Sequence, residues 1–186
     1  MGEENEELKG KLIIDLEKTR SYFQQLIGSL DRNDFQRMSH NPGWTNGEVL
    51  AHIAFGMMLA VPLIPITRFW GRLPRGSSKW FAWLLNSLTK PFNWVNAMGA
   101  RGQGKVFGFH QIGSYYDRAH FSILRQIKAI KDDEWSNGMY YPTQWDANFA
   151  EFMTLEMVIR YAITHFEFHA KQIARDNISQ IENERI

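Results

Sequence analysis

The chain has 186 residues, of which 44% are hydrophobic and 22% are charged. This length and composition fit one globular domain with a sizeable core and exclude an intrinsically disordered chain. Cysteine is absent, which excludes disulfides, cysteine-based zinc sites, iron–sulfur clusters and a cysteine nucleophile. The formal net charge is only +1, and the acidic, polar first residues do not resemble a secretory signal peptide. We therefore expect a cytoplasmic protein.

The charges are unevenly spread along the chain. Residues 49–116 contain no acidic residue, whereas the segments on either side carry more acids than bases. Four of the seven tryptophans lie in this central segment, together with seven basic residues. The basic residues are Arg68, Arg72, Arg75, Lys79, Lys90, Arg101 and Lys105. The sequence thus predicts a cationic, aromatic segment between two acidic helical ones.

Apolar residues at helical spacing predict two helices in the first part of the chain. The first covers about residues 3–30, where large apolar side chains recur at spacings of three, four or seven. The second begins near Thr45, because Thr45 and Glu48 have the spacing of a capping box. Its first turns are apolar on nearly all sides, which indicates a buried helix. Pro62 and Pro65 should end or kink it.

Residues 66–110 have a mixed pattern of aromatic, basic and glycine residues. Residues 79–88 predict a short aromatic helix, and residues 92–98 predict another helical piece. The run 99–108 contains four glycines and two basic residues, which favours a mobile loop.

Two further helices are predicted in the last part of the chain. One covers about residues 111–131 and is followed by a loop over residues 132–145. The other covers about residues 149–178, with Asn148 and Glu151 at the positions of a starting cap. No strand pattern of useful length is present.

These elements predict an all-α fold, a four-helix bundle with a long crossover between the second and third helices. We expect one domain over residues 1–186, with an aromatic and basic insertion at about residues 66–110.

Three of the six histidines form a candidate metal site. His165 and His169 are four residues apart, so they share one face of the last helix with apolar residues. His52 lies on the buried second helix. A buried imidazole needs a partner for each nitrogen, and a divalent ion held by three imidazoles meets this need while leaving a position open. Zinc, nickel and iron all accept imidazole ligands.

Other polar residues near this constellation have simpler explanations. An H-x-x-x-H pair by itself is weak, since many such pairs bind no metal. His40, His110 and His120 are more simply boundary histidines, although His120 could add a fourth polar group to the cavity. Glu48 could support a ligand, but its capping role is the simpler one.

Two motif blocks carry a family resemblance. The first is W-T-x-x-E-V-L-A-H over residues 44–52, and the second is H-x-x-x-H-x-x-Q-I over residues 165–173. Their order and separation resemble the DinB/YfiT-like superfamily. The resemblance implies a four-helix bundle with a long crossover, in which His52, His165 and His169 bind one divalent metal. Characterised relatives include metal-dependent thiol S-transferases and isomerases that use mycothiol, bacillithiol or glutathione.

The activity that this resemblance implies is transfer of a low-molecular-weight thiol to a small-molecule electrophile. The nucleophile would be a metal-bound thiol or water, and no general base can be identified from the sequence. Arg68, Arg72 and Arg101 are candidates for binding a carboxylate of the cofactor or substrate. The simpler reading is that they are solvated loop charges.

Two other functions remain open. The chain could be a non-catalytic metal-binding stress protein, or a membrane-surface module that uses the insertion at 66–110. A packed lid or a dimer contact is the preferred reading of the aromatic residues there. We expect a homodimer, and we expect no nucleic-acid binding because the basic residues do not line one helix face.

Overall fold

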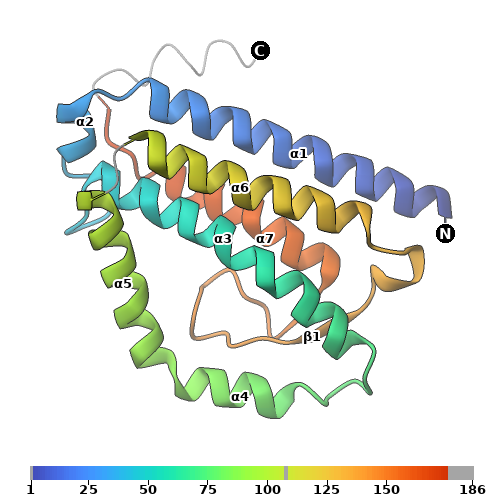
Figure 1. Ribbon diagram of the computed structural model, residues 1–186. Helices are drawn as coiled ribbons and strands as arrows, with labels where there is room; N and C mark the ends of the chain where they lie inside the picture. The colour runs from blue at the N-terminus through green and yellow to red at the C-terminus, as the bar shows by residue number, and fades with distance from the viewer. Residues whose placement is uncertain (1, 107–108, 176–186) are drawn as a thin grey trace.

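The computed structural model of the chain describes residues 2–106 and 109–175, without the side chains of residues 100–110. Within this part the fold is mostly helical, with seven α-helices and one small two-stranded sheet (Figure 1). Figure 1 shows the four helices of the bundle side by side. They are α1 (Gly2–Gly28), α3 (Asn46–Gly71), α6 (Phe109–Lys128) and α7 (Leu155–Ala170). The predicted all-α four-helix bundle is confirmed.

Helix α3 is the central helix of the bundle. It packs against α5 (Thr89–Val106), α6 and α7, whereas α1 packs against α6 and α7. The predicted apolar stripe of α1 is buried, and its Phe23 stacks on Tyr116 of α6 with ring centroids 4.0 Å apart. By length and composition α3 would be able to cross a membrane, but half of its most apolar stretch is buried inside the bundle.

The start of α3 is fixed by the capping box that the sequence predicts. The Thr45 hydroxyl accepts a hydrogen bond from Glu48 N (3.2 Å), and the Glu48 carboxylate accepts one from Thr45 N (2.8 Å). A short helix, α2 (Arg32–Gln36), precedes it, and Asp31 and Asp34 form a second capping box there. Glu48 therefore has the structural role that its spacing indicates.

The two prolines do not end α3, which continues to Gly71. Pro65 has no backbone N–H, so it leaves the carbonyl of Val61 without its helical donor. Gln126 on α6 fills this position, since its Nε2 donates to Val61 O at 3.1 Å. A side chain from a neighbouring helix thus replaces the missing backbone hydrogen bond, and this compensation is invisible in the local sequence.

The crossover consists of α4 (Lys79–Ser87) and α5; in Figure 1 α4 lies below the bundle and α5 runs from it back up to the bundle. The expected loop over residues 99–108 is wrong in its first part, because α5 continues as a helix through Val106; residues 107–108 lie outside the described residues. Phe92 of α5 stacks on Trp145 with ring centroids 3.9 Å apart, and Trp145 Nε1 donates to Leu85 O of α4. These contacts join the crossover to the loop that precedes α7.

The segment before α7 differs from the prediction. A 3-10 helix, η1 (Asp132–Glu134), is followed by two strands, β1 (Gly138–Tyr140) and β2 (Phe152–Thr154), which pair antiparallel. The sequence predicted no strand pattern of useful length, and these three-residue strands are too short to show an alternating pattern.

The start of α7 was also predicted wrongly. Asn148 and Glu151 do not cap it; the helix begins at Leu155, and the Thr154 side chain accepts from Met157 N at 3.3 Å. It ends at Ala170 rather than near residue 178, and residues 176–178 lie outside the described residues.

Candidate metal site

His52, His165 and His169 converge between α3 and α7. One nitrogen of each ring lies within 4.8 Å of the corresponding nitrogens of the other two. The Nε2 atoms of His52 and His169 are 3.2 Å apart, and the rings of His165 and His169 have centroids 4.5 Å apart. The structure thus brings together the three side chains that the sequence selected.

Burial lowers the pKa of all three imidazoles. The pKa of His52 falls to about 4, chiefly because of desolvation and also because of the neighbouring His169. The pKa of His165, which is almost fully buried, lies well below its ordinary value, and that of His169 is lowered as well. At neutral pH the three rings are therefore uncharged, and each offers a lone pair.

The orientation of His169 is set by Gln172. His169 Nδ1 lies 2.9 Å from Gln172 Oε1, and an amide oxygen only accepts hydrogen bonds, so Nδ1 carries the proton. Its Nε2 then presents a lone pair to the other two histidines. Metal-binding histidines usually donate the N–H of the ring nitrogen that does not bind the metal to an acceptor of this kind.

His52 has a similar neighbour in Asn96 of α5. His52 Nδ1 and Asn96 Oδ1 are both buried and without a hydrogen-bond partner of good geometry. The Asn96 side chain is nevertheless close enough to raise the pKa of His52 against the effect of burial. His165 Nδ1 is also buried without a partner. Three neutral rings, two of which have a buried nitrogen without a partner, fit a divalent cation, since a buried polar atom is costly unless it is bonded.

The cavity beside His52 and His165 is small, with a volume of about 10 Å³. Its polar lining residues besides the histidines are Asp146, Asn96 and Tyr161, and the other walls are apolar. The apolar walls are formed by Phe55, Gly56, Leu59, Phe92, Trp145 and Phe149. In this conformation the space holds little more than one water molecule.

Asp146 is a site residue that the sequence analysis missed. Its Oδ2 accepts a hydrogen bond from the Tyr161 hydroxyl at 2.9 Å and lies 3.9 Å from His165 Nε2. Burial raises the pKa of Tyr161, so this hydroxyl keeps its proton. Asp146 lies in the loop before β2, at no helical spacing from the histidines, so the sequence carried no signal for it.

Two of the predicted cofactor-binding arginines lie away from the histidines. Arg68 and Arg72 both contact the buried carboxylate of Glu134, at 2.6 Å and 2.9 Å. Arg68 is 16 residues after His52 on α3, which corresponds to about 24 Å along the helix. The side chain of Arg101 lies outside the described side chains. Cofactor binding by these residues stays a prediction, and the positions of Arg68 and Arg72 relative to the histidines give it no support.

The remaining histidine candidates are not part of the cluster in the described part of the chain. His120 is fully buried on α6, where its Nε2 is 3.3 Å from a carboxylate oxygen of Glu17 on α1. His40 is exposed, and the side chain of His110 lies outside the described side chains. None of these histidines adds a ligand to the site in the described part of the chain.

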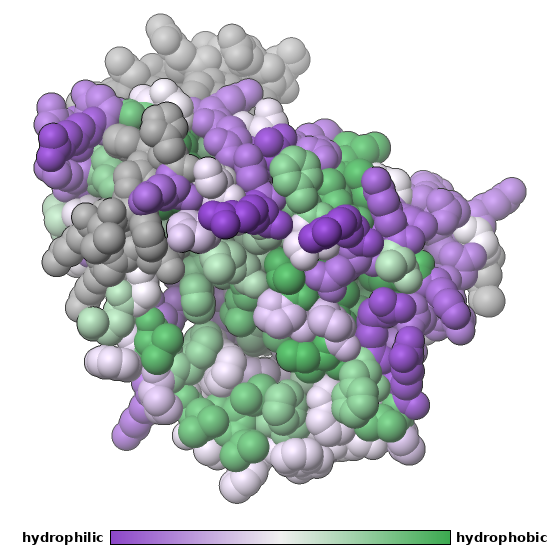
Figure 2. All heavy atoms as spheres, in the orientation of Figure 1, coloured by the Kyte–Doolittle hydropathy of each residue, from purple (hydrophilic) through white to green (hydrophobic). Residues whose placement is uncertain are grey.

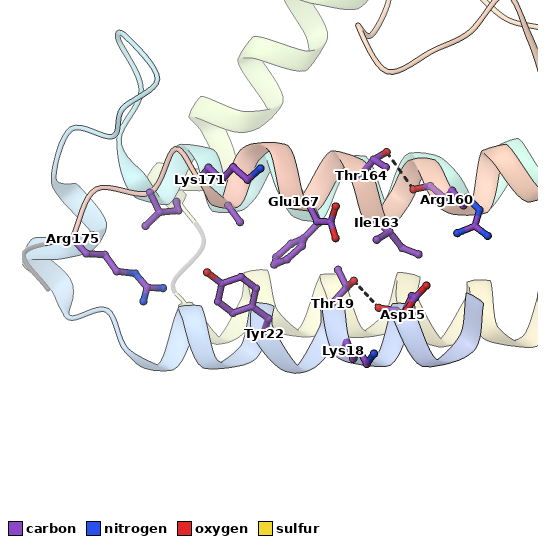
Figure 3. A pocket seen from close by; sticks show the side chains of 13 residues that line it. Asp15, Lys18, Thr19, Tyr22, Arg160, Ile163, Thr164, Glu167, Lys171 and Arg175 are labelled. Atoms are coloured by element: carbon purple, nitrogen blue, oxygen red, sulfur yellow. Dashed lines mark hydrogen bonds between the residues drawn. The ribbon is translucent and has the colours of Figure 1, made fainter. Parts of the chain in front are cut away.

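A larger groove, with a volume of about 1000 Å³, lies between α1 and α7 (Figure 3). Figure 3 shows Asp15, Lys18, Thr19 and Tyr22 on α1 facing Glu167 and other residues of α7. The groove is also lined by Arg160, Ile163, Thr164, Phe166, Glu167 and Ala170 of α7 and by Lys171 at its C-cap. Helical spacing places them on the face of α7 opposite His165 and His169, so the groove is separate from the histidines.

A family comparison agrees with this geometry. The family model described as DinB superfamily matches residues 15–173. The chain belongs to the DinB superfamily. The match includes all three histidines and confirms the resemblance that the two motif blocks carry.

Two solved structures are similar to this DinB-superfamily chain. Both are crystal structures of mycothiol-dependent maleylpyruvate isomerase, one of them of a histidine-to-alanine mutant. Each aligns with a TM-score of 0.61 at 11% sequence identity and covers 89% or 90% of this chain. This chain spans about 60% of the length of those proteins. The identity is low, so the likeness shows the fold alone. No curated protein sequence matches the chain.

Proposed function

We propose that His52, His165 and His169 bind one divalent metal ion, and that the chain is a metal-dependent enzyme that transfers a small thiol to an electrophile. The convergence of three neutral imidazole rings, with donor atoms within 4.8 Å of one another, is the observation that carries this proposal. Zinc, nickel and iron are all compatible with imidazole ligands. The mycothiol dependence of the similar isomerase suggests the class of thiol.

A divalent ion bound there would supply a Lewis acid that favours the deprotonated form of a thiol. The chain itself supplies orientation and a dry environment. Gln172 fixes the tautomer of His169, and the aromatic walls of the cavity exclude water. The carboxylate of Asp146, which lies beside His165, would accept the proton that the thiol loses. The thiolate then forms a bond to an electrophilic carbon of a double bond, the π electrons move to the neighbouring atom, and that atom takes up the proton held by Asp146.

The decisive experiment is metal analysis of the purified protein and of His169→Ala. The matched control is His40→Ala, which removes an exposed histidine outside the cluster. We expect one metal ion per chain in the wild type and the control, and a large loss in His169→Ala. Equal metal content in all three proteins contradicts the proposed site.

Activity needs a separate assay. Mycothiol, bacillithiol and glutathione are tested with a generic electrophile, with and without a chelator. The proposal expects thiol conjugation that stops when the metal is removed and returns when it is added back. A metal-loaded protein that shows no turnover with any of these thiols contradicts the enzymatic part alone.

The small cavity favours a second candidate function, a metal-binding protein without catalysis. A volume of about 10 Å³ does not admit a thiol unless α5 or the loop that carries Trp145 moves. Cobalt substitution separates the two functions, because the visible spectrum of cobalt changes when sulfur joins its ligands. A spectrum that changes on addition of thiol supports the enzyme, and an unchanged spectrum supports the binding protein.

A further inference from the structure

Helix α4 carries a row of large apolar side chains on its outer face. Trp80, Trp83, Leu84 and Leu88, the last at the cap of α4, are spaced i, i+3, i+4 and i+8, which places them on one side of the helix. Trp80 is 60% exposed and Trp83 is 71% exposed. We call these four residues the outer face of α4.

The opposite side of the same helix is also apolar, but it is packed. Ala82 on that side is buried, and Phe81, between the two sides, stacks on Trp70 with ring centroids 5.6 Å apart. A helix at the surface of a globular protein needs one apolar side to pack against its core. Helix α4 has two apolar sides. Packing against the rest of the chain explains why the inner side is apolar, but it does not explain why the outer side is.

The outer face continues into neighbouring exposed residues. The ring of Trp80 contacts Trp70, and Trp70 contacts the exposed ring of Phe69 at the end of α3. Figure 2 shows hydrophobic atoms gathered along the edge where Figure 1 places α4, whereas the side formed by α1 is largely hydrophilic. Exposed apolar residues also occur on α5, namely Trp94, Val95 and Met98. A contiguous apolar surface of this kind marks an interaction site.

The charged residues of the crossover segment itself are all basic. Arg75, Lys79 and Lys90 are exposed beside α4, and residues 49–116 contain no acidic residue. Arg75 and Lys79 lie over the rings of Phe152 and Tyr140 rather than against carboxylates. The crossover therefore offers basic side chains to an anionic partner.

A second copy of this chain fits the face poorly. A two-fold contact would bring the basic residues of one copy against those of the other, with no acid in the segment to pair with them. An anionic bilayer supplies both chemistries that the face needs, an apolar layer for the side chains and phosphate groups for the bases. Tryptophan beside lysine and arginine is the composition typical of protein surfaces at the lipid headgroup level.

We infer that the outer face of α4 binds the surface of an anionic lipid bilayer, with Trp80 and Trp83 in the headgroup region and Arg75, Lys79 and Lys90 on lipid phosphates. The contact is peripheral, because α3, the helix that is long enough to span, is packed in the bundle against α5, α6 and α7. The inference is independent of the metal site, since none of its residues ligates there.

Co-sedimentation with vesicles tests this inference. One set of vesicles contains phosphatidylcholine mixed with phosphatidylglycerol, and the other contains phosphatidylcholine alone. The wild type should bind the anionic vesicles and lose binding at high salt. The double variant Trp80→Ala/Trp83→Ala should bind at least about tenfold more weakly, because each indole contributes apolar area that leaves water. Circular dichroism checks that the variant keeps its helical content.

The matched control is Ile14→Ala/Phe121→Ala, which removes two exposed apolar side chains from α1 and α6. It should bind vesicles as the wild type does, and so should His169→Ala. Failure of the wild type to bind anionic vesicles overturns the inference, as does an equal loss in the control. A wild type that is dimeric without lipid and a Trp80→Ala/Trp83→Ala variant that is monomeric would show that a second copy covers the face, which also overturns it.

Discussion

Gly56 on α3 lies directly against the imidazole of His165 on α7. A Cβ atom at position 56 would overlap Cε1, Nδ1 and Nε2 of that ring. The absence of a side chain allows the two helices to approach closely enough for His52, one turn earlier on α3, to reach the ring nitrogens of α7. A glycine inside a helix costs about 1 kcal/mol relative to alanine, so its presence here is explained by this approach.

The substitution Gly56→Ala should therefore disrupt the metal site. The new methyl group must displace either the His165 ring or the backbone of α3, and we expect metal affinity to fall by about tenfold or more. Metal titration followed by mass spectrometry or calorimetry measures the effect. The control is Gly10→Ala on α1, where a Cβ meets nothing within 4 Å. Unchanged metal affinity in Gly56→Ala would show that the histidines do not need this geometry.

The sequence predicted the elements that depend on local rules. Thr45 and Glu48 cap α3 as their spacing indicates, and the apolar face of α7 points His165 inward. The sequence did not predict features that depend on residues far away in the chain. Gln126 supplies the hydrogen bond that Pro65 cannot make, and only the packed bundle brings that amide to α3.

In the candidate site, too, the residues on helices could be predicted and the residue in a loop could not. The histidines lie on helices, where spacing defines a face, so they could be selected from the sequence. Asp146 comes from a loop whose position is fixed by a hydrogen bond to Tyr161 and by the stacking of Trp145 on Phe92. These are long-range contacts between side chains, and no periodic pattern encodes them.

The lowered pKa values of the three histidines predict how metal binding couples to protons. The pKa of His52 is about 4 instead of 6.5, and those of His165 and His169 are lowered too, so the rings are neutral at pH 7. Metal binding at that pH should release almost no protons from the histidines. Calorimetry in two buffers with different protonation enthalpies should give nearly equal binding enthalpies. Release of one or more protons would mean that the rings are charged before the metal binds.

Asn96 should act as a positioning residue for His52. If Asn96 Oδ1 accepts from His52 Nδ1 when a metal is bound, Asn96→Ala should lower metal affinity by about tenfold, the usual effect of losing a residue that orients a ligand. The control is Asn93→Ala, an exposed asparagine on the same helix. Metal titration of both variants, with melting curves to show equal stability, makes the test. Equal metal affinity in the two variants would remove Asn96 from the site.

Glu134 should make stability depend on pH. Burial alone would raise its pKa, but hydrogen bonds from Arg68, Lys131 N and Arg72 outweigh burial and lower the pKa from 4.5 to about 2. The ionised carboxylate therefore stabilises the folded state fully above about pH 4.5, and this contribution is lost as the pH falls toward 2. We expect Glu134→Gln to cost about 2 kcal/mol at neutral pH and progressively less below pH 4.5.

Urea denaturation across this pH range measures the difference between the two proteins. Glu151→Gln, which changes an exposed carboxylate, is the control and should follow the wild type. A difference between wild type and Glu134→Gln that stays constant down to the lowest pH would place the stabilisation in packing rather than in charge.

The hydrogen bond between Gln126 and Val61 should be worth measuring by a double-mutant cycle. Gln126→Ala leaves the Val61 carbonyl without a donor, and we expect a loss of about 1 kcal/mol of unfolding free energy. In the Pro65→Ala background a backbone N–H at position 65 is available to the same carbonyl, so Gln126→Ala should cost much less there. Urea denaturation of the four proteins gives the coupling energy. Equal costs in both backgrounds would show that Gln126 acts through its packing against α3 and not through this carbonyl.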